Sequence, residues 1–145
     1  KNMNIIMLKQ TENEVLIEKK EVENLDLDTM YSLIGCRYVD VKNIHPIALG
    51  SGLPSNMLLV FDDEFLIERD NPKANKIASF LFGYLMHGQS LCGNVILCQD
   101  DKEGNMTGFS DEEADDIIAN LNYIDEFVSK IEFVVQEPTM EFVQF

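Results

Sequence analysis

The stretch Met57-Leu58-Leu59-Val60-Phe61, followed by Asp62-Asp63-Glu64, decides the fold class of this chain. Its five consecutive apolar residues leave no polar side, and a strand of that kind is covered by protein on both faces. We therefore predict that it lies inside a sheet, with other elements packed above and below. A second stretch, Gly93-Asn94-Val95-Ile96-Leu97-Cys98, predicts another buried strand of the same kind.

Shorter strands are predicted around these two. Residues 4–8 form a mostly apolar run, and residues 14–18 are expected to pair with them as a hairpin across Thr11-Glu12-Asn13. Residues 38–41 (Tyr38-Val39-Asp40-Val41) predict a further strand, whereas residues 42–56 carry the Gly and Pro residues that mark a loop. Together these elements predict a mixed or mainly antiparallel sheet.

Two helices are predicted between the strands. Leu27, Met30, Tyr31 and Ile34 recur at helical spacing, with Asp26 or Asp28 as the N-cap and Gly35 as the C-terminal stop. Asn71-Pro72 predicts the start of a second helix over residues 73 to about 85, whose inner side consists of Ala74, Ile77, Ala78, Leu81 and Leu85.

The C-terminal part begins with a capping-box pattern, Ser110-Asp111-Glu112-Glu113. The apolar stripe that follows (Ala114, Ile117, Ile118, Leu121) loses its phase at Asp125, so a break is expected at residues 120–122, with a second short helix over 122–130. Residues 131–145 alternate around Glu137-Pro138-Thr139, which predicts a hairpin. The prediction is one α+β domain of residues 1–145, with three or four helices packed on the sheet, a core of residues 3–120 and a helix-hairpin extension of residues 122–145.

Composition restricts the classes of function. The chain has 145 residues and carries 11 Lys and Arg against 26 Asp and Glu, a net charge of −15. This charge disfavours direct binding of nucleic acid or of an anionic membrane and suits a basic protein partner. No apolar run approaches the ~20 residues of a membrane span. The three cysteines show no CxxC spacing, which is typical of reduced thiols, so we expect a cytoplasmic protein.

Acidic residues cluster between positions 100 and 126, where ten acids accompany one base, Lys102. Helical spacing places Glu112, Asp115 and Asp116 opposite the apolar stripe, where they could imitate the phosphate path of a duplex. The alternative is a solvated face whose first-turn acids are favoured by the helix dipole. The candidate partner-binding residues are Asp100, Asp101, Glu103, Asp111, Glu112, Asp115, Asp116 and Glu126.

Catalytic and cofactor motifs are missing from the sequence. There is no GxSxG, Walker A or GxGxxG pattern. A Cys–His nucleophile pair would form only if the fold brought Cys36 or Cys92 to His45 or His87. Asp62-Asp63-Glu64 could bind a divalent cation, although a hairpin turn is the more ordinary role of such a triplet. We therefore expect no enzyme, cofactor or metal site. A homodimer could form through Phe80-Leu81-Phe82-Gly83-Tyr84-Leu85-Met86 or through the C-terminal hairpin.

The order of these motifs resembles a small domain family of unknown function encoded on phages, plasmids and conjugative elements of Firmicutes. The resemblance spans residues 3–120 and carries no catalytic residues. It implies a mobile-element protein, and such elements carry proteins that block host defences. We expect a non-enzymatic acidic binding protein, in its sharper form a DNA-mimic inhibitor of a host defence nuclease, or alternatively a self-associating assembly module. The matching motifs are Leu27 to Gly35, Tyr38-Val39-Asp40-Val41, Leu58 to Glu64, Asn71-Pro72, Gly93-Asn94-Val95-Ile96-Leu97 and Gly108 to Glu113.

Overall fold

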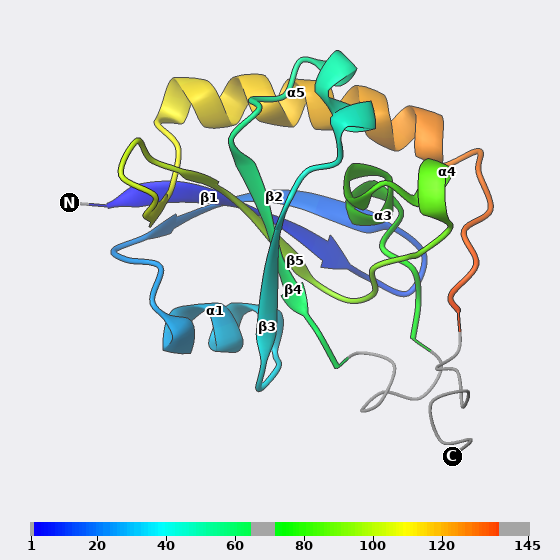
Figure 1. The fold of residues 1–145 in the computed structure, drawn as a ribbon, viewed down its shortest axis with the longest axis horizontal. Helices are drawn as coiled ribbons and strands as arrows, with labels where there is room; N and C mark the ends of the chain where they lie inside the picture. Colours follow the sequence, from blue (N-terminus) through cyan, green and yellow to red (C-terminus); the bar gives the residue numbers. More distant parts are fainter. Residues whose placement is uncertain (1, 65–71, 137–145) are drawn as a thin grey trace.

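An antiparallel sheet forms the middle layer of the computed structural model, which describes residues 2–64 and 72–136 (Figure 1). Its order is β2-β1-β5-β4-β3, with β6 paired to the end of β5. All pairings among these strands are antiparallel, so the α+β class and the mainly antiparallel form of the sheet are confirmed. The strands are β1 (Met3–Gln10), β2 (Val15–Val22), β3 (Val39–Asn43), β4 (Met57–Asp62), β5 (Val95–Asp100) and β6 (Met106–Thr107).

The two apolar stretches of the sequence are β4 and β5, neighbours inside the sheet. All residues of β4 are buried. Leu59 and Phe61 belong to the core on one face of the sheet, while Leu58 and Val60 belong to the core on the other. Because successive side chains point to opposite faces, a strand covered on both sides needs apolar residues at every position.

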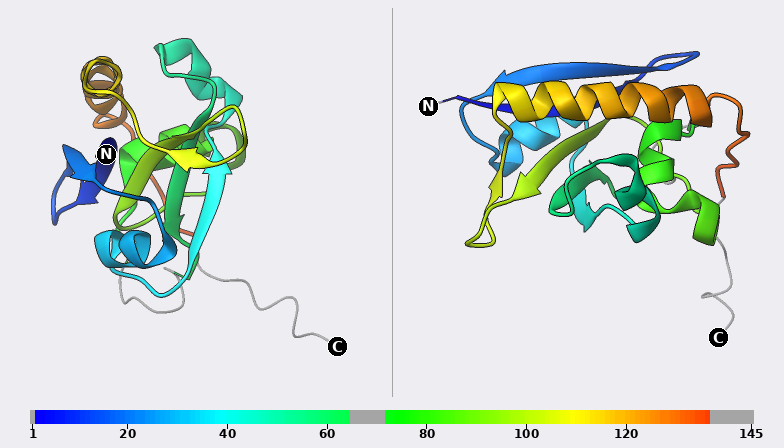
Figure 2. Two further views of the ribbon diagram at one scale, coloured as in Figure 1. Left: turned by 90° about the vertical axis from the view of Figure 1, so that its left-hand side faces the viewer. Right: turned by 90° about the horizontal axis from the view of Figure 1, so that it is seen from above.

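Helices cover the two faces unequally (Figures 1 and 2). Of the helices in the described residues, only α1 lies on one face, where Met30 and Ile34 pack into the smaller core. Asp26 caps its start and Gly35 ends it with a φ of 81°, as predicted. The other face carries the larger core and the remaining helices. The helices of the described residues are α1 (Leu27–Ile34), the 3-10 helix η1 (Pro46–Ser51), α3 (Lys76–Phe82), α4 (Tyr84–His87) and α5 (Asp111–Val128).

The prediction of a helix over residues 73 to about 85 placed both ends of the helix wrongly. α3 begins at Lys76, because Asn75 is its N-cap and Asn75 Oδ1 accepts a hydrogen bond from the Ala78 N–H at 3.0 Å. It ends at Gly83, whose φ is 104°, and α4 follows as a separate turn. A Cβ at Gly83 would lie 2.6 Å from His45 Cδ2, so a larger residue would clash where the chain changes direction.

The break predicted near residue 121 was also wrong, since α5 is one continuous helix. Its buried positions are Ala114, Ile117, Leu121, Ile124 and Val128, which keep one phase over the whole length. Ile118, which the prediction placed in the stripe, is only partly buried. Asp125 lies at the edge of the stripe and is partly buried, so the helix accommodates it without a kink.

Residues 131–136 form no strand, contrary to the predicted first arm of a C-terminal hairpin. This segment packs against α4 and the loop that follows it. The Val134 N–H donates to the Tyr84 hydroxyl at 2.9 Å, and Ser90 Oγ donates to the Val134 carbonyl at 2.8 Å. The second arm of the predicted hairpin lies outside the described residues. Among the described residues, none of the helices has the length and apolar character that a bilayer span requires.

Candidate functional site

The first two turns of α5 concentrate negative charge on the surface. Ser110 Oγ accepts a hydrogen bond from the Glu113 N–H at 3.1 Å, and Glu113 Oε1 accepts one from the Ser110 N–H at 2.9 Å. The predicted capping box is therefore confirmed, with Ser110 as the N-cap and Glu113 as its N3 residue. The helix dipole favours the acids around it. We call the four other exposed acids of these turns the acidic surface: Asp111, Glu112, Asp115 and Asp116.

Strand β2 brings a lysine to one side of the acidic surface. Lys19 Nζ lies 3.1 Å from Asp115 Oδ1 and 3.7 Å from Asp111 Oδ1. The hydrogen bond to Asp115 raises the pKa of Lys19. Asn4 Nδ2 also donates to Asp111 Oδ1 at 2.8 Å, so Asp111 joins the start of α5 to β1 as well. Within the described residues neither Glu112 nor Asp116 forms an ion pair, which leaves the side of α5 away from β2 negatively charged.

The acids predicted to extend this surface before α5 lie elsewhere. Asp100 ends β5, and Asp101 and Glu103 lie in the turn between β5 and β6. Asp101 Oδ1 accepts hydrogen bonds from the N–H groups of Asn105 and Glu103 at 2.9 and 2.8 Å, and these bonds lower the pKa of Asp101. Figure 2 shows this turn at the same end of the molecule as the start of α5, projecting away from the helix. Asp101 therefore forms the turn, and the structure does not merge the three acids with the acidic surface.

Glu126 lies near the other end of α5, about 22 Å from Asp111 along the helix axis at the usual rise per residue. Its neighbour Asp125 is partly buried, and burial raises the pKa of Asp125, with smaller contributions from Glu14 and Glu126. Asp125 lines a polar cavity of about 400 Å³ beside the β1–β2 hairpin, together with Lys73 and Lys76. The eight predicted residues are thus divided among the start of α5, the β5–β6 turn and the end of α5.

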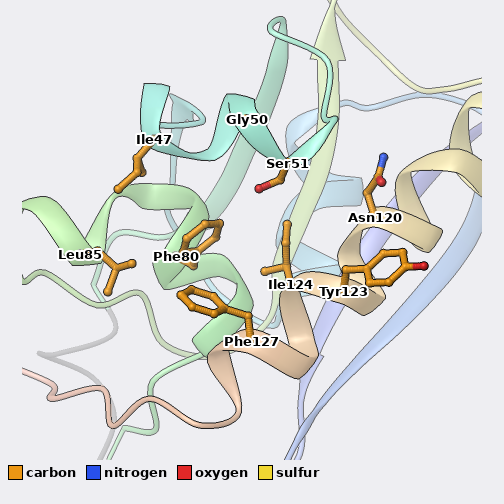
Figure 3. A pocket seen from close by; sticks show the side chains of 9 residues that line it. All are labelled: Ile47, Gly50, Ser51, Phe80, Leu85, Asn120, Tyr123, Ile124 and Phe127. Carbon is orange, nitrogen blue, oxygen red and sulfur yellow. The ribbon is translucent and has the colours of Figure 1, made fainter.

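The structure contains an open pocket beside the C-terminal half of α5 that was not predicted from the sequence (Figure 3). It has a volume of about 560 Å³ and lies between α5, η1, α3 and α4. Figure 3 shows the rings of Phe80 and Phe127 next to each other. Their centroids are 5.8 Å apart, and the rings are arranged edge to face. The lining residues are Ile47, Gly50, Ser51, Phe80, Leu85, Asn120, Tyr123, Ile124 and Phe127.

The sides of this pocket are held together by hydrogen bonds. Asn120 Nδ2 donates to the Gly52 carbonyl at 3.1 Å, which joins α5 to the end of η1. The His45 N–H donates to the Leu81 carbonyl at 2.7 Å, which joins the start of η1 to α3. A Cβ at Gly52 would lie 3.0 Å from Asn120 Nδ2, so the two segments are in close contact. These contacts join the segments that surround the pocket.

Large apolar side chains around the pocket are exposed. Tyr123 is 73% exposed, Phe127 50% and Leu85 42%. Tyr123 and Phe127 are four residues apart on α5 and within the helix predicted over residues 122–130, a spacing that could have indicated an apolar surface. The stretch over residues 80–86 is divided: Phe80 is buried in the core, whereas Leu85, which lines the pocket, and Met86 are exposed.

The residues considered for catalysis are held in structural contacts. The rings of His45 and His87 lie 6.1 Å apart, and each Nδ1 accepts a backbone N–H, from Ile47 and Gln89. Of the two candidate cysteines, Cys36 is partly buried and Cys92 is buried, and burial raises the pKa of the Cys92 thiol to about 12. Cys98, which was not a candidate, is also buried, and burial likewise raises the pKa of its thiol to about 12. Within residues 2–64 and 72–136, no three His, Cys, Asp or Glu side chains lie close enough together to hold a metal ion.

Comparison with known proteins identifies a family. A family model described as "Domain of unknown function (DUF3846)" matches residues 3–122. The resemblance to an uncharacterised domain family, predicted over residues 3–120, is therefore confirmed. No curated protein and no solved structure matches the chain.

Proposed function

The chain belongs to the family described as "Domain of unknown function (DUF3846)". Because this description assigns no role, we propose one from the exposed side chains of the chain itself. We propose a non-enzymatic binding protein that engages a basic surface of another protein through the acidic surface of α5. The observation that carries this proposal is the exposure of four acids in two helical turns, which within residues 2–64 and 72–136 have a single lysine, Lys19, in ion-pair contact.

Three properties of this surface support binding of a cationic partner. The net charge of −15 attracts a basic protein from a distance, and this attraction is screened over about 10 Å at 0.1 M salt. The acids lie on a helix that is capped and packed on the sheet, so the backbone is already ordered before binding. Three of the four are Asp, whose short side chains have less freedom to lose than Glu.

We further propose that the protein is encoded on a mobile genetic element and acts in the cytoplasm. In this narrower form of the proposal, its basic target is the nucleic-acid groove of a host defence nuclease. The family resemblance and the charge support this narrower form. Residues 111–116 span about 8 Å of helix, which corresponds to two or three phosphate steps of about 3.4 Å. The acidic surface would therefore replace only a short part of a DNA strand.

The proposal is tested by comparing two charge-reversal variants in a pulldown from a host lysate. Glu112→Lys with Asp116→Lys leaves both partners of Lys19 in place. Glu23→Lys with Asp28→Lys makes the same change in net charge at exposed residues before and at the start of α1, on the opposite face of the sheet. We expect wild type and the α1 variant to capture a basic protein that is released by moderate salt, and the α5 variant to lose it.

Two results would overturn parts of this proposal. Equal capture by all three proteins would show that the acidic surface is not the binding surface. If the captured protein does not bind DNA, or if duplex DNA does not compete for it, the narrower DNA-mimic form is wrong. Recovery of the chain alone as a salt-resistant oligomer would support the assembly-module alternative instead.

A further inference from the structure

The pocket shown in Figure 3 exposes an apolar surface beside acidic residues of α5. We propose that this pocket binds the apolar side of a basic amphipathic segment from the partner, while Lys and Arg residues of the same segment contact acids of α5. This inference rests on the proposed function and names the class of partner more closely.

The first argument is the apolar character of the pocket. Its volume of about 560 Å³ lies within the range of ligand pockets, about 300–1,000 Å³. Tyr123 and Phe127 contribute aromatic side chains that are half or more exposed. Aromatic residues beside a pocket are the side chains that most often dominate the energy of a protein–protein interface. None of the described residues that line the pocket is charged.

The second argument is the position of the charges along α5. Asp116, Asn120, Tyr123 and Phe127 follow one another at spacings of four, three and four residues, which places them along one side of the helix. The acidic surface therefore ends one turn before the pocket on that side. Glu126 lies between Tyr123 and Phe127 in the chain and lines an adjoining cavity together with Tyr123. The apolar surface is thus bordered by Asp116 on its N-terminal side along α5 and by Glu126 at its flank.

This arrangement favours a basic segment over a second copy of the chain. Two copies meeting at this pocket would bring together two proteins of net charge −15 along their acidic helices, and like charges at an interface are unfavourable. An amphipathic segment with large apolar side chains on one side and Lys or Arg on the other complements both parts of the surface. Such segments bind grooves through apolar anchors at helical spacing.

The test uses three synthetic helical peptides that each carry one Trp, because the chain itself contains none and does not interfere with the fluorescence. The first is an amphipathic Leu/Lys peptide, the second a Ser/Lys peptide of equal charge, and the third a Leu/Glu peptide. We expect the native protein to bind the Leu/Lys peptide at least tenfold more tightly than either of the others, an affinity ratio of ~10 or more for apolar anchors.

Variants then separate the two surfaces. Tyr123→Ala with Phe127→Ala should weaken Leu/Lys binding by about tenfold or more, while Tyr38→Ala, an exposed aromatic residue next to β3, should leave it unchanged. Glu112→Gln with Asp116→Asn should weaken binding of both Lys peptides. Circular dichroism melts check that each variant remains folded.

The outcomes distinguish the inference from the function beneath it. If the Tyr123 and Phe127 variant binds Leu/Lys peptide as wild type does, while the Glu112 and Asp116 variant loses it, the pocket has no part and only the acidic surface binds. If neither charge nor apolar substitution matters, the proposed function fails as well. Equal binding of Leu/Lys and Leu/Glu peptides would mean that the pocket accepts apolar ligands of any charge, which overturns the basic segment.

Discussion

Replacing Asn75 tests the packing that holds the larger core together. The Asn75 side chain is fully buried and contacts three segments. Its Nδ2 donates to the Leu8 carbonyl of β1 at 3.1 Å and to the Gly93 carbonyl before β5 at 2.9 Å. Its Oδ1 accepts from the Ala78 N–H at the start of α3. Asn75→Ala removes all three bonds and leaves two carbonyls and one N–H without this partner.

The expected loss of stability can be worked from these bonds. Removing an N-cap costs about 1 kcal/mol. Each of the two buried carbonyls loses a donor, at about 1 kcal/mol each. The free energy of unfolding should therefore fall by about 3 kcal/mol, a large part of the total of a domain of this size. Asn75→Asp keeps the acceptor for Ala78 but places a carboxylate against the Leu8 and Gly93 carbonyls, so it should be at least as destabilising at neutral pH.

Urea unfolding followed by circular dichroism measures these changes. Asn122→Ala is the control, because Asn122 is exposed on α5 and alanine is a better helix former, so its effect should be within about 0.5 kcal/mol of zero. The slope of the transition should stay constant among the variants. A loss below about 1 kcal/mol for Asn75→Ala, with an unchanged slope, would refute the argument that this amide ties β1, β5 and α3 together.

Three further predictions follow from other contacts. Ser110→Ala should lower the free energy of unfolding by about 1 kcal/mol through loss of the capping box, measured by urea unfolding. Asp125→Asn should raise Tm at neutral pH, because burial raises the pKa of Asp125 and so penalises its charge in the folded state. That gain is fully present above the raised pKa and disappears in acid below the usual value of 3.8, where both states are protonated, and melts at both pH values check it. Titration of the native protein with a thiol reagent should modify Cys36 first and leave Cys92 and Cys98 unreacted until denaturant is added, because only Cys36 is partly exposed and the pKa of the other two is about 12.

Local signals in the sequence were sufficient where one segment contains all the groups that interact. The capping box of Ser110 and Glu113 and the Asp26 and Gly35 ends of α1 involve neighbours within four residues, so a linear pattern predicts them. The buried stretches of β4 and β5 were also predicted, because apolar residues on both sides of a strand require cover on both faces.

Errors arose where a distant contact decides the structure. Asn75 begins α3 because Leu8 and Gly93 present carbonyls to it, whereas the local Asn71-Pro72 pattern favoured an earlier start. Asp125 does not interrupt α5, since the helix needs only five buried positions in phase to pack on the sheet. Tyr123 and Phe127 both fell within the helix predicted over residues 122–130, but their position next to η1 and α3 is set by tertiary packing, so the pocket was not predicted.

The sequence by itself therefore determined the α+β class, the charge of −15, the two-sided burial of β4 and β5, and the acids of α5, since each depends on composition or on contacts short along the chain. Tertiary structure alone decided which acids share a surface and that a pocket lies beside them. Lys19 contacts Asp115, which lies 96 residues later in the sequence, and it also contacts Asp111. Asn120 contacts Gly52, from which it is separated by 68 residues. Such partners are neighbours only after the sheet and helices have packed, so no linear pattern contains them.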